Sequence, residues 1–134
     1  INNYGTAFIP GSGSHKLSIV HVLDVVNLIS LIIKKKPKGY FNAAALDPKS
    51  IIQWVDMIGE TLNLRNVTKF HIHLYALNYI SKFFKYRILA QEQLIMLSMP
   101  HVLNIDSSTR QGWAPKYKTK NIISEITQSI IKPS

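Results

Sequence analysis

A pair of histidines and a glycine turn are the residues whose types and spacing could do chemistry on their own. His71 and His73 stand two positions apart, a spacing that aligns two metal ligands only on a strand. The chain has no cysteine and no carboxylate close to this pair in sequence, so we expect no metal site there. Gly11-Ser12-Gly13 lacks the third glycine and the following helix of a phosphate-binding loop, so we expect no phosphate cradle.

The basic charge of the chain is its second chemical feature. The formal net charge is +9, and lysines gather at residues 34–38 and 116–120. The first group ends a predicted helix, where cations interact favourably with the helix dipole, and the second lies in a proline-containing loop. No helix-turn-helix, zinc-finger spacing or aromatic RNA-binding motif accompanies them. We therefore interpret these lysines as solvated and expect no nucleic-acid partner, with binding of an anionic partner as the alternative.

Length and composition limit the class of protein. The 134 residues, 46% of them hydrophobic, fit one compact domain over residues 1–134. The apolar segment 20–33 is interrupted by Asp24, Asn27 and Ser30, so no membrane span is expected. The absence of cysteine and of a secretory signal favours a cytoplasmic protein. The first residue is Ile1 rather than methionine, which is consistent with a piece of a longer protein.

The elements that position these residues follow from the spacing of apolar side chains. Residues 2–14 are rich in Gly, Asn, Pro and Ser and predict a loop. A β-branched run at 18–22 predicts a short strand. Asp24 stands near the start of the following helix, where its carboxylate can accept free amide hydrogens as a cap and backbone tie. Residues 40–44 predict a second strand.

The second half of the chain is predominantly helical in its pattern. Asp47 as N-cap with Pro48 at the first position predicts a helix that runs to about Leu62. The other predicted elements are an extended segment at 67–70, helices at 74–84, 91–98 and 119–131, and a possible strand at 102–105. So few strands cannot make a complete doubly wound sheet, and they suit the closing part of one.

Four short patterns occur in a fixed order over residues 11 to 130. They are Gly11-Ser12-Gly13 with His21-Val22-Leu23-Asp24-Val25, then Gly39-Tyr40-Phe41-Asn42, then Ser50-Ile51-Ile52, and finally Gly112-Trp113-Ala114-Pro115. Together they resemble the C-terminal half of an extended short-chain dehydrogenase/reductase, the NAD(P)-dependent epimerase/dehydratase superfamily. The resemblance implies an α/β fold, the C-terminal part of a Rossmann-like fold, mostly helical with a few short strands. Gln111 departs from the leucine that is usual there.

The substrate class stays open within this resemblance. Sugar-nucleotide epimerases usually carry an arginine that holds the diphosphate a little before the final strand. Here residues 96–101 read Met-Leu-Ser-Met-Pro-His, and the segment 92–98 is closer to the group that resembles 3β-hydroxysteroid dehydrogenases and dihydroflavonol reductases. The small-molecule substrate is accordingly expected to be a sugar nucleotide or an apolar hydroxy or keto compound.

The superfamily's catalytic parts are absent from the sequence. Its members bind the dinucleotide with a Gly-x-x-Gly-x-x-Gly turn and move protons with a Tyr-x-x-x-Lys pair. None of the six tyrosines here has a lysine four positions later, and Tyr79 has Lys82 at only three. We therefore expect the dinucleotide-binding N-terminal half, with its NAD or NADP, to lie outside this chain. The isolated chain should bind no cofactor and be inactive, with no catalytic residue of its own.

Four residues are candidates for substrate binding by this resemblance and by position. His21 would lie near the substrate cleft, or else be a core histidine with one ring nitrogen bonded to backbone. Lys16 could meet a phosphate or carboxylate, or be an exposed loop lysine. Asn42 ends a predicted strand, where it could contact a ligand or hold the next turn. Trp113 could line the pocket or anchor the chain by packing with Pro115.

Two functions from different classes remain. The chain is either the substrate-binding region of an NAD(P)-dependent oxidoreductase or epimerase, partnered by the missing N-terminal half, or a stand-alone basic module for an anionic partner. A homodimer through helices is a further expectation of the resemblance.

Overall fold

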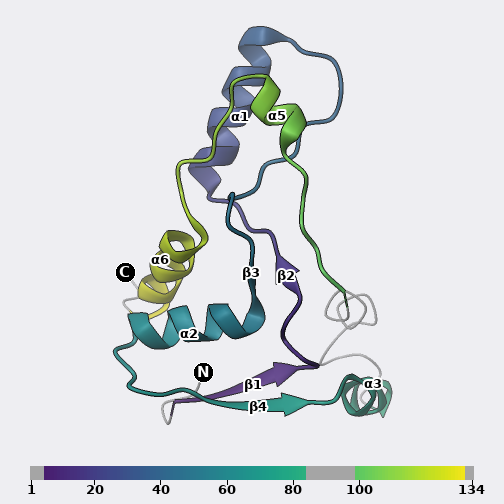
Figure 1. The fold of residues 1–134 in the computed structure, drawn as a ribbon, viewed down its shortest axis with the longest axis vertical. Coiled ribbons are helices and arrows are strands. Elements are labelled where there is room, and N and C mark those ends of the chain that lie inside the picture. Colours follow the sequence, from purple (N-terminus) through teal and green to yellow (C-terminus); the bar gives the residue numbers. More distant parts are fainter. Residues whose placement is uncertain (1–4, 84–98, 132–134) are drawn as a thin grey trace. The chain divides into compact units, whose positions relative to one another are not determined.

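The computed structural model describes residues 5–83 and 99–131, and this part of the chain belongs to two compact units (Figure 1). Unit 1 is drawn from Ile1–Leu17 and Lys49–His101, and unit 2 from Ser18–Pro48 and Val102–Ser134. Each unit therefore joins two segments that are distant in sequence. The fold class is the expected one, mixed α/β and mostly helical with a few short strands.

Unit 1 is built on two parallel strands. β1 (Thr6–Pro10) pairs with β4 (Thr68–Ile72), with Phe8 opposite Phe70. Ala7 and Ile9 alternate with Phe8, so they turn to the other face and form a core with Val55 of α2 (Ile51–Thr61). The prediction of a loop over residues 2–14 is wrong at β1. The partner strand lies some 60 residues away, so the local Gly and Pro signals concealed a strand that tertiary pairing stabilises.

The start of α2 corrects a second prediction. β2 (Lys16–Leu17) pairs antiparallel with β3 (Lys49–Ser50), and the helix follows at once. Ser50, not Asp47, is the N-cap: its hydroxyl accepts from Gln53 N, and Gln53 Oε1 accepts from Ser50 N. Asp47 instead accepts the backbone N–H of Thr119 at 2.9 Å through its carboxylate. The carboxylate of Asp47 therefore accepts a hydrogen bond from a distant part of the chain and does not cap α2.

Ser50→Ala is expected to lower the free energy of unfolding by about 1 kcal/mol, the usual cost of losing a helix cap. The alanine removes the acceptor at 3.3 Å from Gln53 N and leaves that N–H without its capping partner. Urea titration followed by circular dichroism measures the change. Ser50→Thr keeps the hydroxyl and should stay within a few tenths of a kcal/mol of the parent. Equal losses in the two variants would contradict the capping role.

The rest of unit 1 follows the predictions where it is described. β4 begins one residue after the start of the extended segment predicted at 67–70, and α3 (Leu74–Phe83) matches the described part of the predicted helix at 74–84. The predicted helix at 91–98 lies outside the described residues.

The described residues of unit 2 form the helices α1 (Val22–Lys35), α5 (Asp106–Arg110) and α6 (Thr119–Ile131). α6 has the predicted bounds. His21 is the N-cap of α1, so Asp24 is not the cap that the sequence suggested. Asp24 does act as the predicted backbone tie, because its carboxylate accepts two main-chain N–H groups from residues 116 and 117.

Three segments of unit 2 were predicted as strands, 18–22, 40–44 and 102–105; in the structure they are irregular, except that Val22 is already the first residue of α1. They are linked by single hydrogen bonds rather than by ladders: Ala45 N donates to Ile19 O at 2.8 Å, and Leu103 N donates to Ser18 Oγ at 3.0 Å. A β-branched run becomes a strand only when a neighbour offers a row of backbone groups. Within the described residues these segments have no such neighbour.

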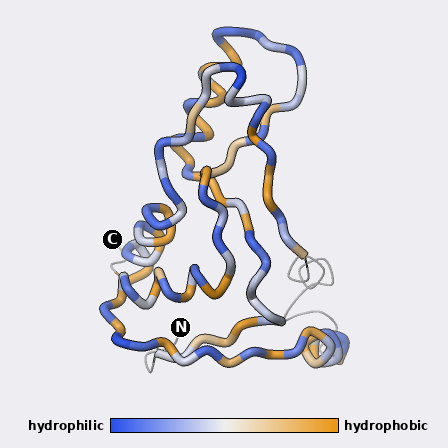
Figure 2. The backbone as a smooth tube through the Cα atoms, viewed as in Figure 1, coloured by the Kyte–Doolittle hydropathy of each residue, from blue (hydrophilic) through white to orange (hydrophobic). Residues whose placement is uncertain are grey.

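α1 carries an apolar stripe that faces solvent. Figure 2 shows hydrophobic residues recurring along this helix, and at four positions spaced four, three and four apart they are half or more exposed: Val22, Val26, Ile29 and Ile33. The opposite side of α1 is fixed by Leu28, which is 4% exposed. In the described part of the chain no helix is long and apolar enough to cross a membrane.

Candidate functional site

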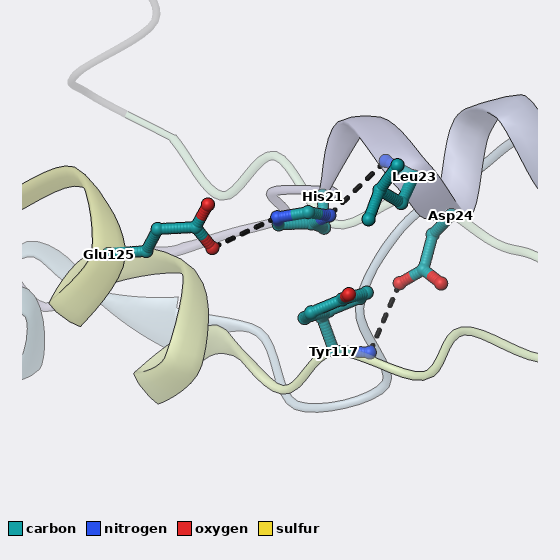
Figure 3. A network of polar contacts seen from close by, with 5 residues as sticks. All are labelled: His21, Leu23, Asp24, Tyr117 and Glu125. Carbon is teal, nitrogen blue, oxygen red and sulfur yellow. Dashed lines mark hydrogen bonds and ion pairs between the residues drawn. The ribbon is translucent and has the colours of Figure 1, made fainter. Parts of the chain in front are cut away.

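His21 lies at the centre of a polar network in unit 2 (Figure 3). The side chain is nearly buried, with the residue 8% exposed. Its Nδ1 accepts the N–H of Leu23 at 3.2 Å, and its Nε2 lies 3.0 Å from Glu125 Oε2 on α6. The ring of Tyr117 stacks on the imidazole with centroids 3.8 Å apart and planes 17° from parallel. The start of α1 and the exposed side of α6 are thereby joined through one ring.

Asp24 holds the segment that positions Tyr117. The residue is 1% exposed, and its two carboxylate oxygens accept from Lys116 N at 3.0 Å and Tyr117 N at 3.1 Å. Its own carbonyl accepts the indole N–H of Trp113 at 3.0 Å. Residues 113–117 are therefore tied to the first turn of α1 by three hydrogen bonds, and this tie places the Tyr117 ring on His21 (Figure 3).

A small surface pocket opens beside His21. Its volume is about 250 Å³, and its apolar walls are formed by Val20 before α1, by Val22 at the start of α1, and by Ile122 and Ile126 of α6. The polar side chains that line it are His21, Glu125 and Ser129. An apolar pocket with a few polar groups is the usual form of a small-molecule site.

The hydrogen bonds fix the tautomer of His21. A backbone N–H can only donate, so Nδ1, which accepts from Leu23, carries no proton. The proton of the neutral ring is then on Nε2 and is donated to Glu125. Both ring nitrogens are engaged, so His21 cannot act as a free general base, and its role is to position Glu125 and the helix start.

The tautomer of His21 is a direct prediction. We expect long-range ¹H–¹⁵N correlation spectra of the neutral ring to show an unprotonated Nδ1 and a protonated Nε2. His71 provides the matched control, because its Nδ1 lies 3.0 Å from the carbonyl of Gly11, which only accepts. His71 should therefore show the opposite tautomer. The same tautomer at both residues would contradict the hydrogen-bond directions assigned here.

The other predicted site residues lie apart from this pocket's lining. Trp113 is 3% exposed and is held on Asp24, so it belongs to the support of Tyr117 and not to the pocket wall. Asn42 is exposed and donates to the carbonyl of Asn104 at 2.9 Å. Lys16 belongs to unit 1, is exposed on β2, and accepts from His101 N through its backbone carbonyl. Of the four predicted site residues, the structure links His21 with Trp113, because the segment 113–117 also carries Tyr117, which stacks on His21.

Glu125 and Ser129 were not singled out from the sequence. Glu125 is the one acidic residue in the isoleucine-rich helix at 119–131, and it directly precedes Ile126 of the apolar face. An acid at the edge of an apolar face is a signal that could have drawn attention to it. Its partner His21 lies 104 positions away, and no spacing rule connects them.

His71 and His73 occur at the carboxyl end of β4. They line a second surface pocket, of about 450 Å³, with Gly11 and Tyr75 among its other walls, and the His73 and Tyr75 rings stack at 5.3 Å. Among the described residues no group of three or more histidine or acidic side chains could hold a metal ion. The turn at 11–13 leads into the strand β2 and not into a helix, so its residues do not fit a dinucleotide phosphate loop.

Comparison with solved structures identifies the class of fold. It is shared with part of an NAD-binding dehydratase: dTDP-glucose 4,6-dehydratase from Bacillus anthracis in complex with NAD matches with a TM-score of 0.66 at 16% identity, over 95% of this chain and 34% of that one. A conserved protein of unknown function from Silicibacter pomeroyi matches with a TM-score of 0.63 at 14% identity, over 96% of this chain and 43% of that one.

These matches define the fold and its extent. The chain spans about a third of the length of the dehydratase and less than half of the second protein. No model of a known protein family matches the sequence. No curated protein matches it either.

Proposed function

We propose that this chain is the substrate-binding C-terminal region of an NAD(P)-dependent sugar-nucleotide epimerase/dehydratase or a related oxidoreductase. The observation that carries the proposal is the shared fold with dTDP-glucose 4,6-dehydratase over 95% of the chain. The order of the short sequence patterns over residues 11 to 130 independently points to the same superfamily. The chain contributes a binding surface, and the dinucleotide and the proton-transfer pair belong to the other half of the enzyme.

The His21 pocket supports a binding role. It combines apolar walls with a histidine and a carboxylate that are hydrogen-bonded to each other. Because both nitrogens of His21 are engaged, the pocket can hold and orient a small molecule but has no free base to abstract a proton. This agrees with a division in which the catalytic tyrosine and lysine come from another segment. The bound NAD would supply hydride transfer there.

Unit 2 presents a surface suited to that other half. The α1 stripe (Val22, Val26, Ile29 and Ile33) is exposed, and the apolar segment 40–44 has no strand neighbour in the described residues. In α/β proteins, an uncovered apolar stripe on a helix that is followed in sequence by a β-type segment is usually packed against a larger parallel sheet. A dinucleotide-binding domain, with such a sheet, is the partner of matching architecture.

The proposal is tested by joining this chain to a dinucleotide-binding segment encoded upstream that carries Gly-x-x-Gly-x-x-Gly and Tyr-x-x-x-Lys. We expect the fusion to bind NAD or NADP and to change nicotinamide absorbance with a sugar nucleotide or an apolar hydroxy compound. The chain alone should do neither.

The matched control is the fusion with phenylalanine in place of the catalytic tyrosine, which should bind dinucleotide without turnover. A fusion that folds but neither binds dinucleotide nor turns over any compound of the two classes would overturn the proposal. Binding of an anionic macromolecule by the chain alone, together with that failure, would favour the stand-alone basic module.

A further inference from the structure

The polar side chains that line the pocket beside His21 offer only hydrogen-bond acceptors to a ligand. Its three polar side chains have committed their protons: Nε2–H of His21 is donated to Glu125, and the Ser129 hydroxyl is donated to the carbonyl of Ile126 at 2.8 Å. Nδ1 of His21 is occupied by Leu23 N–H. What remains is the Glu125 carboxylate, which accepts several hydrogen bonds, and the lone pairs of the Ser129 oxygen.

The charge of the pocket also favours a ligand that donates a hydrogen bond. The Glu125 side chain is 65% exposed, and the neutral His21 ring that donates to it does not cancel its negative charge. A phosphate or carboxylate placed here would meet this charge without a free side-chain donor, and a keto oxygen would find no side-chain partner. A hydroxyl or ammonium group, in contrast, can donate to the carboxylate in a charge-assisted hydrogen bond.

The size and the walls limit the rest of the ligand. A volume of about 250 Å³ is below the range of roughly 300–1,000 Å³ of sites for drug-sized molecules, so it suits a single ring or one end of a larger molecule. Val20, Val22, Ile122 and Ile126 make the walls apolar, and the last of these is 51% exposed. Burying such walls against a hydrocarbon ring is favourable.

We propose that the pocket binds the hydrogen-bond-donating end, an alcohol or an amine, of a small apolar molecule, with Glu125 as the recognising group and His21 as the residue that positions it. The inference deepens the proposed function and rests on it in taking this molecule as the substrate. Of the two substrate classes it selects the apolar hydroxy compound for this pocket and excludes the diphosphate of a sugar nucleotide from it.

The test is a titration of this chain with four compounds that share one ring: cyclohexanol, cyclohexylamine, cyclohexanone and cyclohexyl phosphate. Methyl chemical shifts of Ile122 and Ile126 report binding in the pocket. We expect the alcohol and the amine to bind about tenfold more tightly than the ketone, the value of one hydrogen bond to a charged group. The phosphate should cause no shift of these methyl groups.

Glu125→Gln is the diagnostic variant. Its amide oxygen still accepts from His21, so the fold is retained, but its NH₂ group adds a donor that serves a ketone. The preference for cyclohexanol over cyclohexanone should shrink to within about twofold. Glu60→Gln makes the same change on α2 in unit 1 and should leave the preference at its original value.

Three results would overturn the inference: a phosphate or ketone that binds as tightly as the alcohol, a preference unchanged by Glu125→Gln, or no binding by any of the four compounds. The titration needs neither dinucleotide nor turnover. Its failure would therefore leave the fusion assay free to support the proposed function, and failure of the fusion assay would not change the titration.

Discussion

Asp24→Ala is expected to lower the free energy of unfolding of unit 2 by about 3 kcal/mol, because it removes two charge-assisted hydrogen bonds and leaves two backbone N–H groups without acceptors. The carboxylate that accepts from Lys116 N and Tyr117 N is almost completely buried, since the residue is 1% exposed. Water can replace only part of what is lost. A second effect is local: the residues that hold Trp113 and Tyr117 against α1 lose their tie.

Two measurements separate the global from the local effect. Urea titration by circular dichroism gives the change in free energy of unfolding, and hydrogen exchange of the Trp113 indole N–H reports the tie itself. The bond from that N–H to the Asp24 carbonyl is formally retained in the variant, at 3.0 Å in the parent. We nevertheless expect its exchange to quicken, because the neighbouring main-chain bonds that hold residues 116 and 117 are gone.

Asp106→Ala is the control for a lost carboxylate. Asp106 is exposed and accepts from Asn104 Nδ2 at 3.0 Å, so its removal should cost about 0.5 kcal/mol or less. Asp24→Asn should fall between the two, because its amide oxygen accepts one N–H while its NH₂ group opposes the other. Equal losses in Asp24→Ala and Asp106→Ala would show that Asp24 does not tie the loop.

The helices were predicted well from the sequence because their signals are local. The apolar period gave α3 and α6 nearly residue by residue, and it placed α2 and α1 correctly in their interiors. The caps were predicted poorly. Asp24 and Asp47 have the right residue type at helix starts, yet each uses its carboxylate on a main-chain N–H more than 70 positions away. Local propensity cannot show such a partner.

The strands were mispredicted for the opposite reason. β1 lies in a segment full of turn residues and is stabilised by pairing with β4, whereas the β-branched segments at 18–22 and 102–105 have no ladder to join among the residues that the structure describes. The residues around His21 show the same difference between local signals and long-range contacts. His21 could be singled out because its position in a sequence pattern is local, but Glu125 and Tyr117 reach it from the far end of the chain.

Gly13→Ala is expected to destabilise unit 1 by about 3 kcal/mol, through two separate effects at one atom. The backbone at Gly13 has φ of +63°, in the left-handed region that costs an L-residue energy. A Cβ there would also collide with Cγ2 of Ile9 and lie 3.2 Å from Cγ1 of Ile52. Ile9 of β1 is 0% exposed in the core, so its side chain cannot move away from an added Cβ.

Gly112→Ala separates the two effects. Its φ of +88° also lies in the region that favours glycine, but the nearest atom to an added Cβ is the flexible Lys35 Nζ at an ordinary 3.6 Å. Its loss should be about 1 kcal/mol, from the backbone conformation alone. If urea titration gave the two variants equal losses, close packing of Gly13 on Ile9 would be contradicted. If Gly13→Ala loses more, as expected, the Gly11-Ser12-Gly13 pattern owes its second glycine to core packing.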